Sequence, residues 1–188
     1  MAASDRRLVA TAGGCSRSRQ AGLTASILSS YGLLWLGTLL AAILVIPIAS
    51  QLRDAFGLRL VPASPGTVSM AGLIAANNAR EAALPLLFAT LNVGGRRWLL
   101  LMGDMVVSAS LAVNVARGGL ALGAYGPDLL RFLPQWPLEW GGLALGLTGW
   151  RQARRGQRDA CELVLLGVGA ATLVCLAALV ETYAVPQA

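Results

Sequence analysis

Residues 23–48 read LTASILSSYGLLWLGTLLAAILVIPI and contain no charged side chain. An apolar helix of this length crosses the hydrocarbon core of a bilayer, about 30 Å at 1.5 Å per residue. The run is longer than the apolar core of a signal peptide, which has roughly 7 to 15 residues, so we expect it to remain attached. This stretch predicts a first transmembrane helix.

The rest of the chain has the same character. Of its 188 residues 56% are hydrophobic and 13% are charged, whereas about a quarter of residues are charged in soluble domains. We expect a flexible basic cytoplasmic tail at 1–20, a membrane domain at 21–188, and a glycine-rich connection, RGGLALGAYG, at 117–126. The composition predicts an all-α, polytopic membrane helical bundle with about five transmembrane helices, at 23–48, 69–93, 98–115, 129–150 and 162–183.

The arginines predict an orientation, because cytoplasmic loops of membrane proteins are rich in basic residues. With the N-terminus inside, ten arginines lie on the cytoplasmic side and four on the other, which favours a cytoplasmic N-terminus and an external C-terminus. The inner set is Arg6, Arg7, Arg17, Arg19, Arg96, Arg97, Arg151, Arg154, Arg155 and Arg158, and the outer set is Arg53, Arg59, Arg117 and Arg131. Because the arginines lie in short clusters between apolar segments, we assign the net charge of +6 to orientation and expect no nucleic-acid partner.

Several kinds of chemistry are disfavoured. The chain has no histidine, which excludes Ser-His-Asp and Cys-His catalysis and imidazole metal sites. Cys15, Cys161 and Cys175 have no CxxC spacing, so we interpret them as free thiols. We therefore expect no metal and no cofactor.

Glycines in the fourth expected span predict close helix packing. The hexapeptide GGLALG occurs at 118–123 and at 141–146, but neither copy has the strand and helix context of a dinucleotide fingerprint. Gly142, Gly146 and Gly149 instead form a face of small residues, along which another helix backbone can approach.

Polar side chains inside the expected spans are the candidates for function, since such residues usually face a bundle interior or a cavity. Asn77, Arg80 and Glu81 have the spacing i, i+3, i+4 and share one helix face, with Asn78 about 100° around the helix. Because an unpaired guanidinium is costly in lipid, we expect Arg80 to be held by Glu139 or Glu81. The expected intramembrane polar cluster comprises Asn77, Asn78, Arg80, Glu81, Glu139 and Glu181, with Asp104, Pro134 and Gln135 as secondary candidates.

The role of this polar cluster has two interpretations. It either locks the helices together or lines a functional cavity. Asp104 is expected to be protonated or bonded to Ser108, which follows one turn later on the same face. Trp136 and Trp140 are interpreted as part of an interfacial aromatic belt.

Three elements occur in a fixed order: Asn77 and Asn78 on a helix, PQWPLEWGG at 134–142, and LVETYAVP at 179–186. Their order resembles that of the stage II sporulation protein M family of bacterial integral membrane proteins, which has Pro-His-Gly-x-x-Glu-Leu-Pro-Ala and Ala-x-x-Glu-Ala-x-x-x-Pro at the last two places. Gln135 replaces the family histidine. The resemblance covers about residues 77–186 and carries over Pro134, Glu139, Asn77 or Asn78, and Glu181.

The resemblance implies a multi-pass protein of the bacterial inner membrane that acts with protein partners. The leading hypothesis is a noncatalytic membrane subunit or scaffold of a multiprotein assembly. A second hypothesis is the membrane component of a transporter or export system paired with a separate ATPase, since the chain has no Walker motif. A third is the membrane subunit of a peptide- or lipid-modifying enzyme, with Glu81, Glu139 or Asp104 as acid or base.

Overall fold

The computed structural model of the protein describes residues 5–56, 67–90, 97–126, 129, 134–157 and 159–183, with side chains from residue 20 onward apart from 53, 55 and 56. The described residues form helices and no strand, which confirms an all-helical bundle. The elements are α1 (Asp5–Val45), the 3-10 helix η1 (Ile46–Ile48), α2 (Ala49–Phe56), α3 (Val68–Thr90), α4 (Arg97–Tyr125), α5 (Trp136–Arg154) and α6 (Ala160–Tyr183).

Local sequence signals set the helix ends. Pro137 lies in the first turn of α5, where a missing N–H costs nothing. Gly156 follows the end of α5 with φ 74°, a conformation that glycine adopts without strain. Asp159 Oδ1 accepts a hydrogen bond of 2.9 Å from the backbone N–H of Cys161 and caps α6. Proline, glycine and aspartate therefore define the two ends of the α5–α6 connection.

Three of the expected boundaries are wrong. α1 begins at Asp5, so residues 5–20 are helical, because their alanines and arginines favour helix and a helix propagates from an apolar segment. α5 begins at Trp136 rather than at residue 129, after Pro134. α4 continues to Tyr125 and includes most of the stretch expected to be a connection. Residues 1–4 and 91–93, the side chains of the N-terminal arginines and of Cys15, and Pro186 lie outside the described residues.

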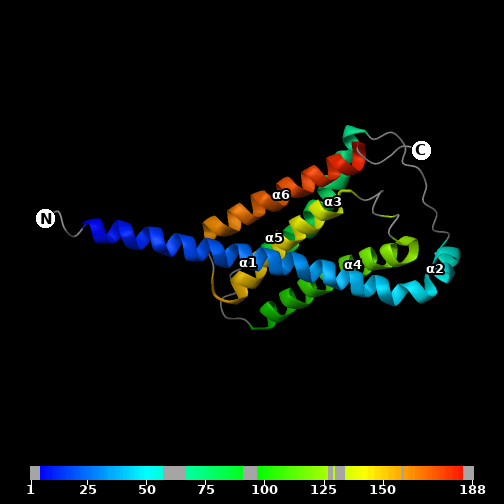
Figure 1. Cartoon of the computed structure of the whole chain (residues 1–188), viewed down its shortest axis with the longest axis horizontal. Coiled ribbons are helices and arrows are strands. Elements are labelled where there is room, and N and C mark those ends of the chain that lie inside the picture. The colour runs from blue at the N-terminus through cyan, green and yellow to red at the C-terminus, as the bar shows by residue number, and fades with distance from the viewer. Residues whose placement is uncertain are drawn as a thin grey trace.

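α5 lies at the centre of the bundle and packs against α1, α3 and α6, while α4 packs mainly against α1 (Figure 1). The contacts give the helix directions. Thr38 lies beside Gly118 and Ala42 beside Gly123, so α1 and α4 run parallel. Ser30 bonds to Thr148 while Trp35 contacts Trp140, so α5 runs against α1.

The remaining contacts complete the pattern of directions. Glu81 on α3 bonds to Ser110 on α4, and Phe88 lies beside Gly103, so α3 runs against α4. Leu166 lies beside Gly149 while Val174 lies beside Gly142, so α6 runs against α5. Successive long helices α1, α3, α4, α5 and α6 therefore alternate in direction.

The glycines of α5 allow its central position. A Cβ on Gly146 would lie 2.5 Å from the Ala82 carbonyl oxygen, and one on Gly142 would lie 3.4 Å from that of Ala170. The predicted small-residue packing face is thus confirmed. α4 uses the same device against α1, because a Cβ on Gly123 would lie 2.6 Å from the Ala42 carbonyl oxygen. This second packing face explains why the glycine-rich stretch is helical rather than a connection.

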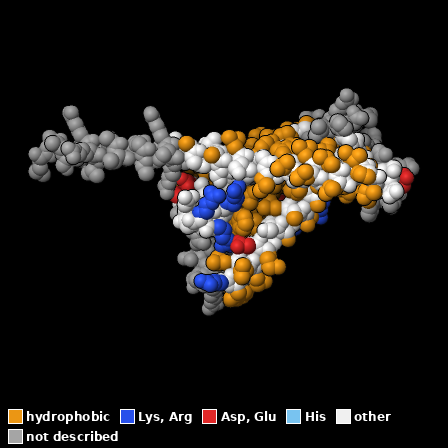
Figure 2. All heavy atoms as spheres, turned by 60° about the horizontal axis from the view of Figure 1, so that its bottom comes forward, with side chains coloured by type: hydrophobic (Ala, Val, Ile, Leu, Met, Phe, Trp, Pro, Cys, Tyr) orange, Lys and Arg blue, Asp and Glu red, His pale blue; other side chains and the backbone are white. Residues whose placement is uncertain are grey.

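The outer surface is suited to lipid. Three helices, at Gln20–Leu52, Arg97–Tyr125 and Ala160–Tyr183, are long and apolar enough to cross a membrane. Leucines such as Leu44 on α1 and Leu165 on α6 are largely exposed, and hydrophobic side chains cover much of the face seen in Figure 2 while arginines gather toward one end. Such large exposed apolar area indicates a membrane protein.

Candidate functional site

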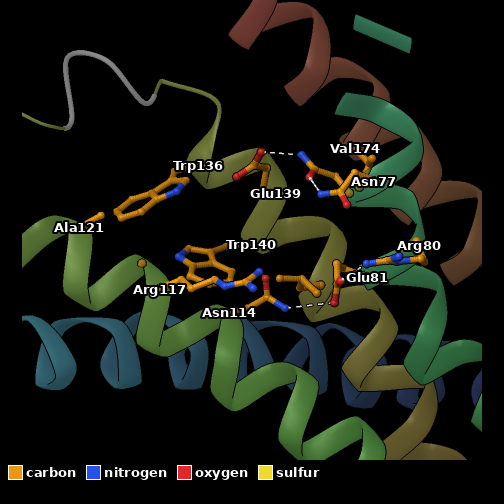
Figure 3. A pocket seen from close by; sticks show the side chains of 13 residues that line it. Asn77, Arg80, Glu81, Asn114, Arg117, Ala121, Trp136, Glu139, Trp140 and Val174 are labelled. Carbon is orange, nitrogen blue, oxygen red and sulfur yellow. Dashed lines mark hydrogen bonds and ion pairs between the residues drawn. The ribbon is translucent and has the colours of Figure 1, made fainter. Parts of the chain in front are cut away.

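A polar cavity of about 310 Å³ lies where α3, α4 and α5 meet, with one residue of α6 completing its wall (Figure 3). Its exposed lining residues Asn77, Arg80 and Arg117 lie on α3 and α4, so its mouth opens between these two helices. The lining of this polar cavity comprises Asn77, Asn78, Arg80, Glu81, Asn114, Arg117, Gly118, Ala121, Trp136, Glu139, Trp140, Leu143 and Val174. Five of the six residues of the predicted polar cluster, all except Glu181, therefore surround one cavity.

Glu81 accepts the largest number of hydrogen bonds in the cavity wall. Ser110 Oγ donates to Glu81 Oε2 at 2.8 Å, and Asn114 Nδ2 donates to the same oxygen at 3.3 Å. The guanidinium of Arg80 donates to Oε1 at 3.3 Å. These donors come from α3 and α4, so the Glu81 carboxylate joins the two helices across the inner end of the cavity.

Glu139 lies in the first turn of α5 and points toward α3 (Figure 3). Asn78 Nδ2 donates to Glu139 Oε1 at 2.7 Å, which ties α3 to α5. Glu181 on α6 lies close enough for its charge to act on Glu139. Asn78 is itself an acceptor for Asn77 Nδ2 at 3.4 Å. Glu139 is thus the carboxyl group on this side of the cavity, with the Asn78 amide as its donor, and Glu181 lies nearby outside the lining.

Arg80 pairs with Glu81 and not with Glu139. Of the two expected partners, the structure selects the neighbouring residue on the same helix. The Arg80 side chain is 76% exposed and that of Glu81 25% exposed. The guanidinium therefore lies at the mouth of the cavity, with the single acceptor just described.

Arg117 is a functional candidate that the sequence reasoning missed. Its side chain runs from α4 toward Asn114 and Trp140 (Figure 3). Among the described residues it has no ion pair, although Glu139 lines the same cavity. Ser110, Asn114, Arg117 and Ala121 are spaced i, i+4, i+7, i+11 and share one face of α4. That pattern was visible, but part of it fell in the stretch expected to be a connection.

The interfacial-belt interpretation is wrong for Trp140. This residue is only 4% exposed and its ring lies 6.4 Å from that of Trp35 at 80°. Trp136 contacts Trp35 in the same edge-on manner, with ring centroids 6.1 Å apart. The indole Nε1 of Trp140 is buried and has no hydrogen-bond partner. Trp136 and Trp140 thus form the α5 wall of the cavity, and Trp35 on α1 packs against both rings.

The secondary candidates lie apart from the cavity. Asp104 pairs with Arg154 Nε at 2.5 Å rather than with Ser108, because α4 and α5 run in opposite directions and bring these residues together. Pro134 is exposed and Gln135 is buried just before α5, where the Gln135 carbonyl accepts the Glu139 N–H at 3.1 Å. These residues therefore position helices and do not line the cavity.

The described cysteines and acidic residues form no metal site in the described part of the chain. Cys161 and Cys175 are free, as expected, and both are exposed. Within the described part of the chain, no three His, Cys, Asp or Glu side chains are grouped so as to hold a metal ion.

No protein-family model, curated protein or solved structure matches the chain. The resemblance to the stage II sporulation protein M family therefore stays a prediction.

Proposed function

We propose that this protein is a noncatalytic, five-span subunit or scaffold of a multiprotein assembly in the bacterial inner membrane. This is also the role that the resemblance to the stage II sporulation protein M family implies. The observation that carries the proposal is Arg80, a guanidinium near the middle of α3 that is 76% exposed.

The helix directions support five crossings. α1, α4 and α6, the three helices apolar enough to span, all run in the same direction. A chain can cross three times in one direction only if it returns between the crossings, and α3 and α5 are the helices that return. With 23 and 19 residues, they are about 34 Å and 28 Å long, close to the thickness of the hydrocarbon core.

The charge distribution supports a cytoplasmic N-terminus. Arg97 begins α4, and Arg151 and Arg154 end α5, so these arginines lie at the same end of the bundle. Basic residues favour the cytoplasmic side. The polar cavity is then in the outer half of the membrane.

A partner helix accounts for the exposure of Arg80. The residue lies twelve positions from the start of α3 and ten from its end, so lipid would surround it on the open side, at a cost of about 2.5 to 3.5 kcal/mol or more. Gly72, Ala76 and Ala83 are exposed on the same face, and small residues let another helix backbone come close. We place the partner on this α3 face, with an acidic or amide side chain as the acceptor for Arg80.

Site-specific photocrosslinking tests this placement. A crosslinker at Ala76 or Ala83 is expected to capture one defined partner in intact membranes, whereas one at Leu165 on the exposed face of α6 is expected to capture mainly lipid. Arg80→Gln should reduce the crosslinked yield by about tenfold, the equivalent of about 1.4 kcal/mol. The matched control is Arg155→Gln, which changes an exposed arginine directly after the last residue of α5 and should leave the crosslinked yield unchanged.

Two results would contradict the proposal. One is a uniform monomer in mild detergent with no crosslink from α3. The other is an unchanged crosslink in Arg80→Gln, which would show that the guanidinium has no role in docking.

The cavity favours a second candidate function, a transport component that works with a separate ATPase. Ionisable residues that face a cavity between membrane helices mark substrate pathways in transporters. If this candidate is right, Glu139→Gln should abolish export or resistance while the complex remains intact. Under the leading proposal, that substitution should leave flux unchanged.

A further inference from the structure

The polar cavity holds a guanidinium and a carboxyl group that do not pair with each other. Arg117 lies on the α4 wall and Glu139 on the α5 wall, and neither has an ion-pair partner among the described residues. They differ from Arg80 and Glu81, which form an ion pair at 3.3 Å. A guanidinium and a carboxyl group without ion-pair partners are costly to ionise inside a membrane, and a ligand that carries both opposite charges stabilises the charged form of each.

Two further groups in the cavity can form additional hydrogen bonds, the indole N–H of Trp140 and the carboxyl group of Glu139. The Trp140 Nε1 donor is buried without an acceptor and belongs to a side chain that lines the cavity. Glu139 accepts one hydrogen bond, from the neutral amide of Asn78, while Glu181 adds a second negative charge nearby. The cavity therefore offers donors for an anionic group near Arg117 and acceptors for an ammonium near Glu139.

The position and size of the cavity indicate how the ligand enters. Its mouth lies between α3 and α4, on the side of the bundle, and Leu143, Val174 and Ala121 make part of the wall apolar. A volume of about 310 Å³ is at the lower end of the range for ligand sites. It fits a headgroup whose acyl chains stay outside in the membrane.

We propose that the polar cavity binds the zwitterionic headgroup of an ethanolamine phospholipid, with the phosphate at Arg117 and the primary ammonium at Glu139. The ammonium has three N–H donors for Glu139, whereas a choline headgroup has none and a glycerol headgroup has no positive charge. Arg117 and Glu139 lie on different helices around the same cavity, so a single headgroup must carry both charges to contact both residues. The inference rests on the membrane placement of α3 and α4 proposed above but requires no protein partner.

Native mass spectrometry of the full chain in mild detergent tests this proposal. The protein is titrated with phosphatidylethanolamine, phosphatidylcholine and phosphatidylglycerol of identical acyl chains. We expect the ethanolamine lipid to be retained about tenfold more strongly than either of the others, because each lacks one of the charge-assisted contacts. Equal retention of the three lipids would overturn the proposal.

The variants identify the residues. Arg117→Gln and Glu139→Gln should each reduce retention of the ethanolamine lipid to the level of the other two, while Arg117→Lys should keep most of it by preserving the positive charge. Arg97→Gln, an exposed arginine at the far end of α4, is the matched control. Helicity and elution volume show whether each variant is folded; retention unchanged in a folded Arg117→Gln protein would contradict the assignment.

A competition experiment with a soluble headgroup distinguishes a membrane phospholipid from a soluble zwitterion as the ligand. Glycerophosphoethanolamine should displace the lipid only weakly, because it lacks chains anchored in the surrounding membrane. Displacement at equal concentration would assign the cavity to a soluble zwitterion and overturn the lipid proposal. If the ethanolamine lipid is not retained but the crosslink from α3 is observed, only the lipid proposal fails. If the lipid is retained but no crosslink from α3 is observed, only the proposed protein partner fails.

Discussion

Ser110 and Asn114 hold the Glu81 carboxylate, although neither was expected in the site. The spacing of Asn77, Arg80 and Glu81 predicted which residues share a face of α3, because the helical period fixes that relation. It could not predict the partners on other helices, since these depend on how α3 and α4 are rotated and shifted relative to each other. Asn78, expected on a different face, is the residue that contacts Glu139.

The Asp104–Arg154 ion pair gives a direct test of these contacts. In a double-mutant cycle with Asp104→Asn and Arg154→Gln, we expect a coupling of about 0.5 to 1 kcal/mol, since the pair is in contact but partly exposed. The coupling free energy is obtained from the shifts in the midpoint of thermal unfolding in detergent. Additive losses would show that the two side chains do not interact.

A second double-mutant cycle, on Arg80 and Glu139, is the control for the Asp104–Arg154 cycle. The structure pairs Arg80 with Glu81, so Arg80→Gln and Glu139→Gln should be additive within about 0.5 kcal/mol, as expected for residues without a shared partner. A larger coupling would restore the alternative pair expected from the sequence.

Helices as units were more predictable than single contacts. The approximate positions of the long helices α1, α3, α4, α5 and α6 followed from apolar runs bounded by charged, proline-rich or glycine-rich segments, whereas the short helix α2 was not expected. The end of α4 did not, because Gly118, Gly119 and Gly123 are poor helix formers when judged by propensity alone. These glycines stabilise the helix through close packing against α1, and that contact exists only in the folded protein.

Substitution of a packing glycine tests the central position of α5. Gly146→Ala should destabilise the protein by about 1 to 3 kcal/mol, because the added methyl group would overlap with the Ala82 carbonyl oxygen. Gly32→Ala on α1 is the control, since nothing lies within 4 Å of its Cβ position, and it should be neutral or stabilising by up to about 1 kcal/mol. Equal effects of the two substitutions on the unfolding midpoint would contradict the packing described.

The assembled molecule explains why its central helix can be rich in glycine and polar at its start. α5 is enclosed by α1, α3 and α6, so the outward faces of its neighbours, and not its own composition, meet the lipid. The sequence predicted a polar cluster inside the membrane. It could not predict the cavity, because the space arises where α4, packed on α1, diverges from α3 and α5.

Cysteine accessibility in intact cells tests the five-span account most directly. Starting from a chain with Cys15, Cys161 and Cys175 replaced by serine, single cysteines are introduced as Gly94→Cys, Asp128→Cys and Gln157→Cys and treated with a membrane-impermeant thiol reagent. We expect labelling of the cysteine at 128 in intact cells, and labelling at 94 and 157 only after the membrane is permeabilised. Labelling at 94 from outside, with both 128 and 157 protected, would mean that α3 and α5 do not cross and would contradict the account.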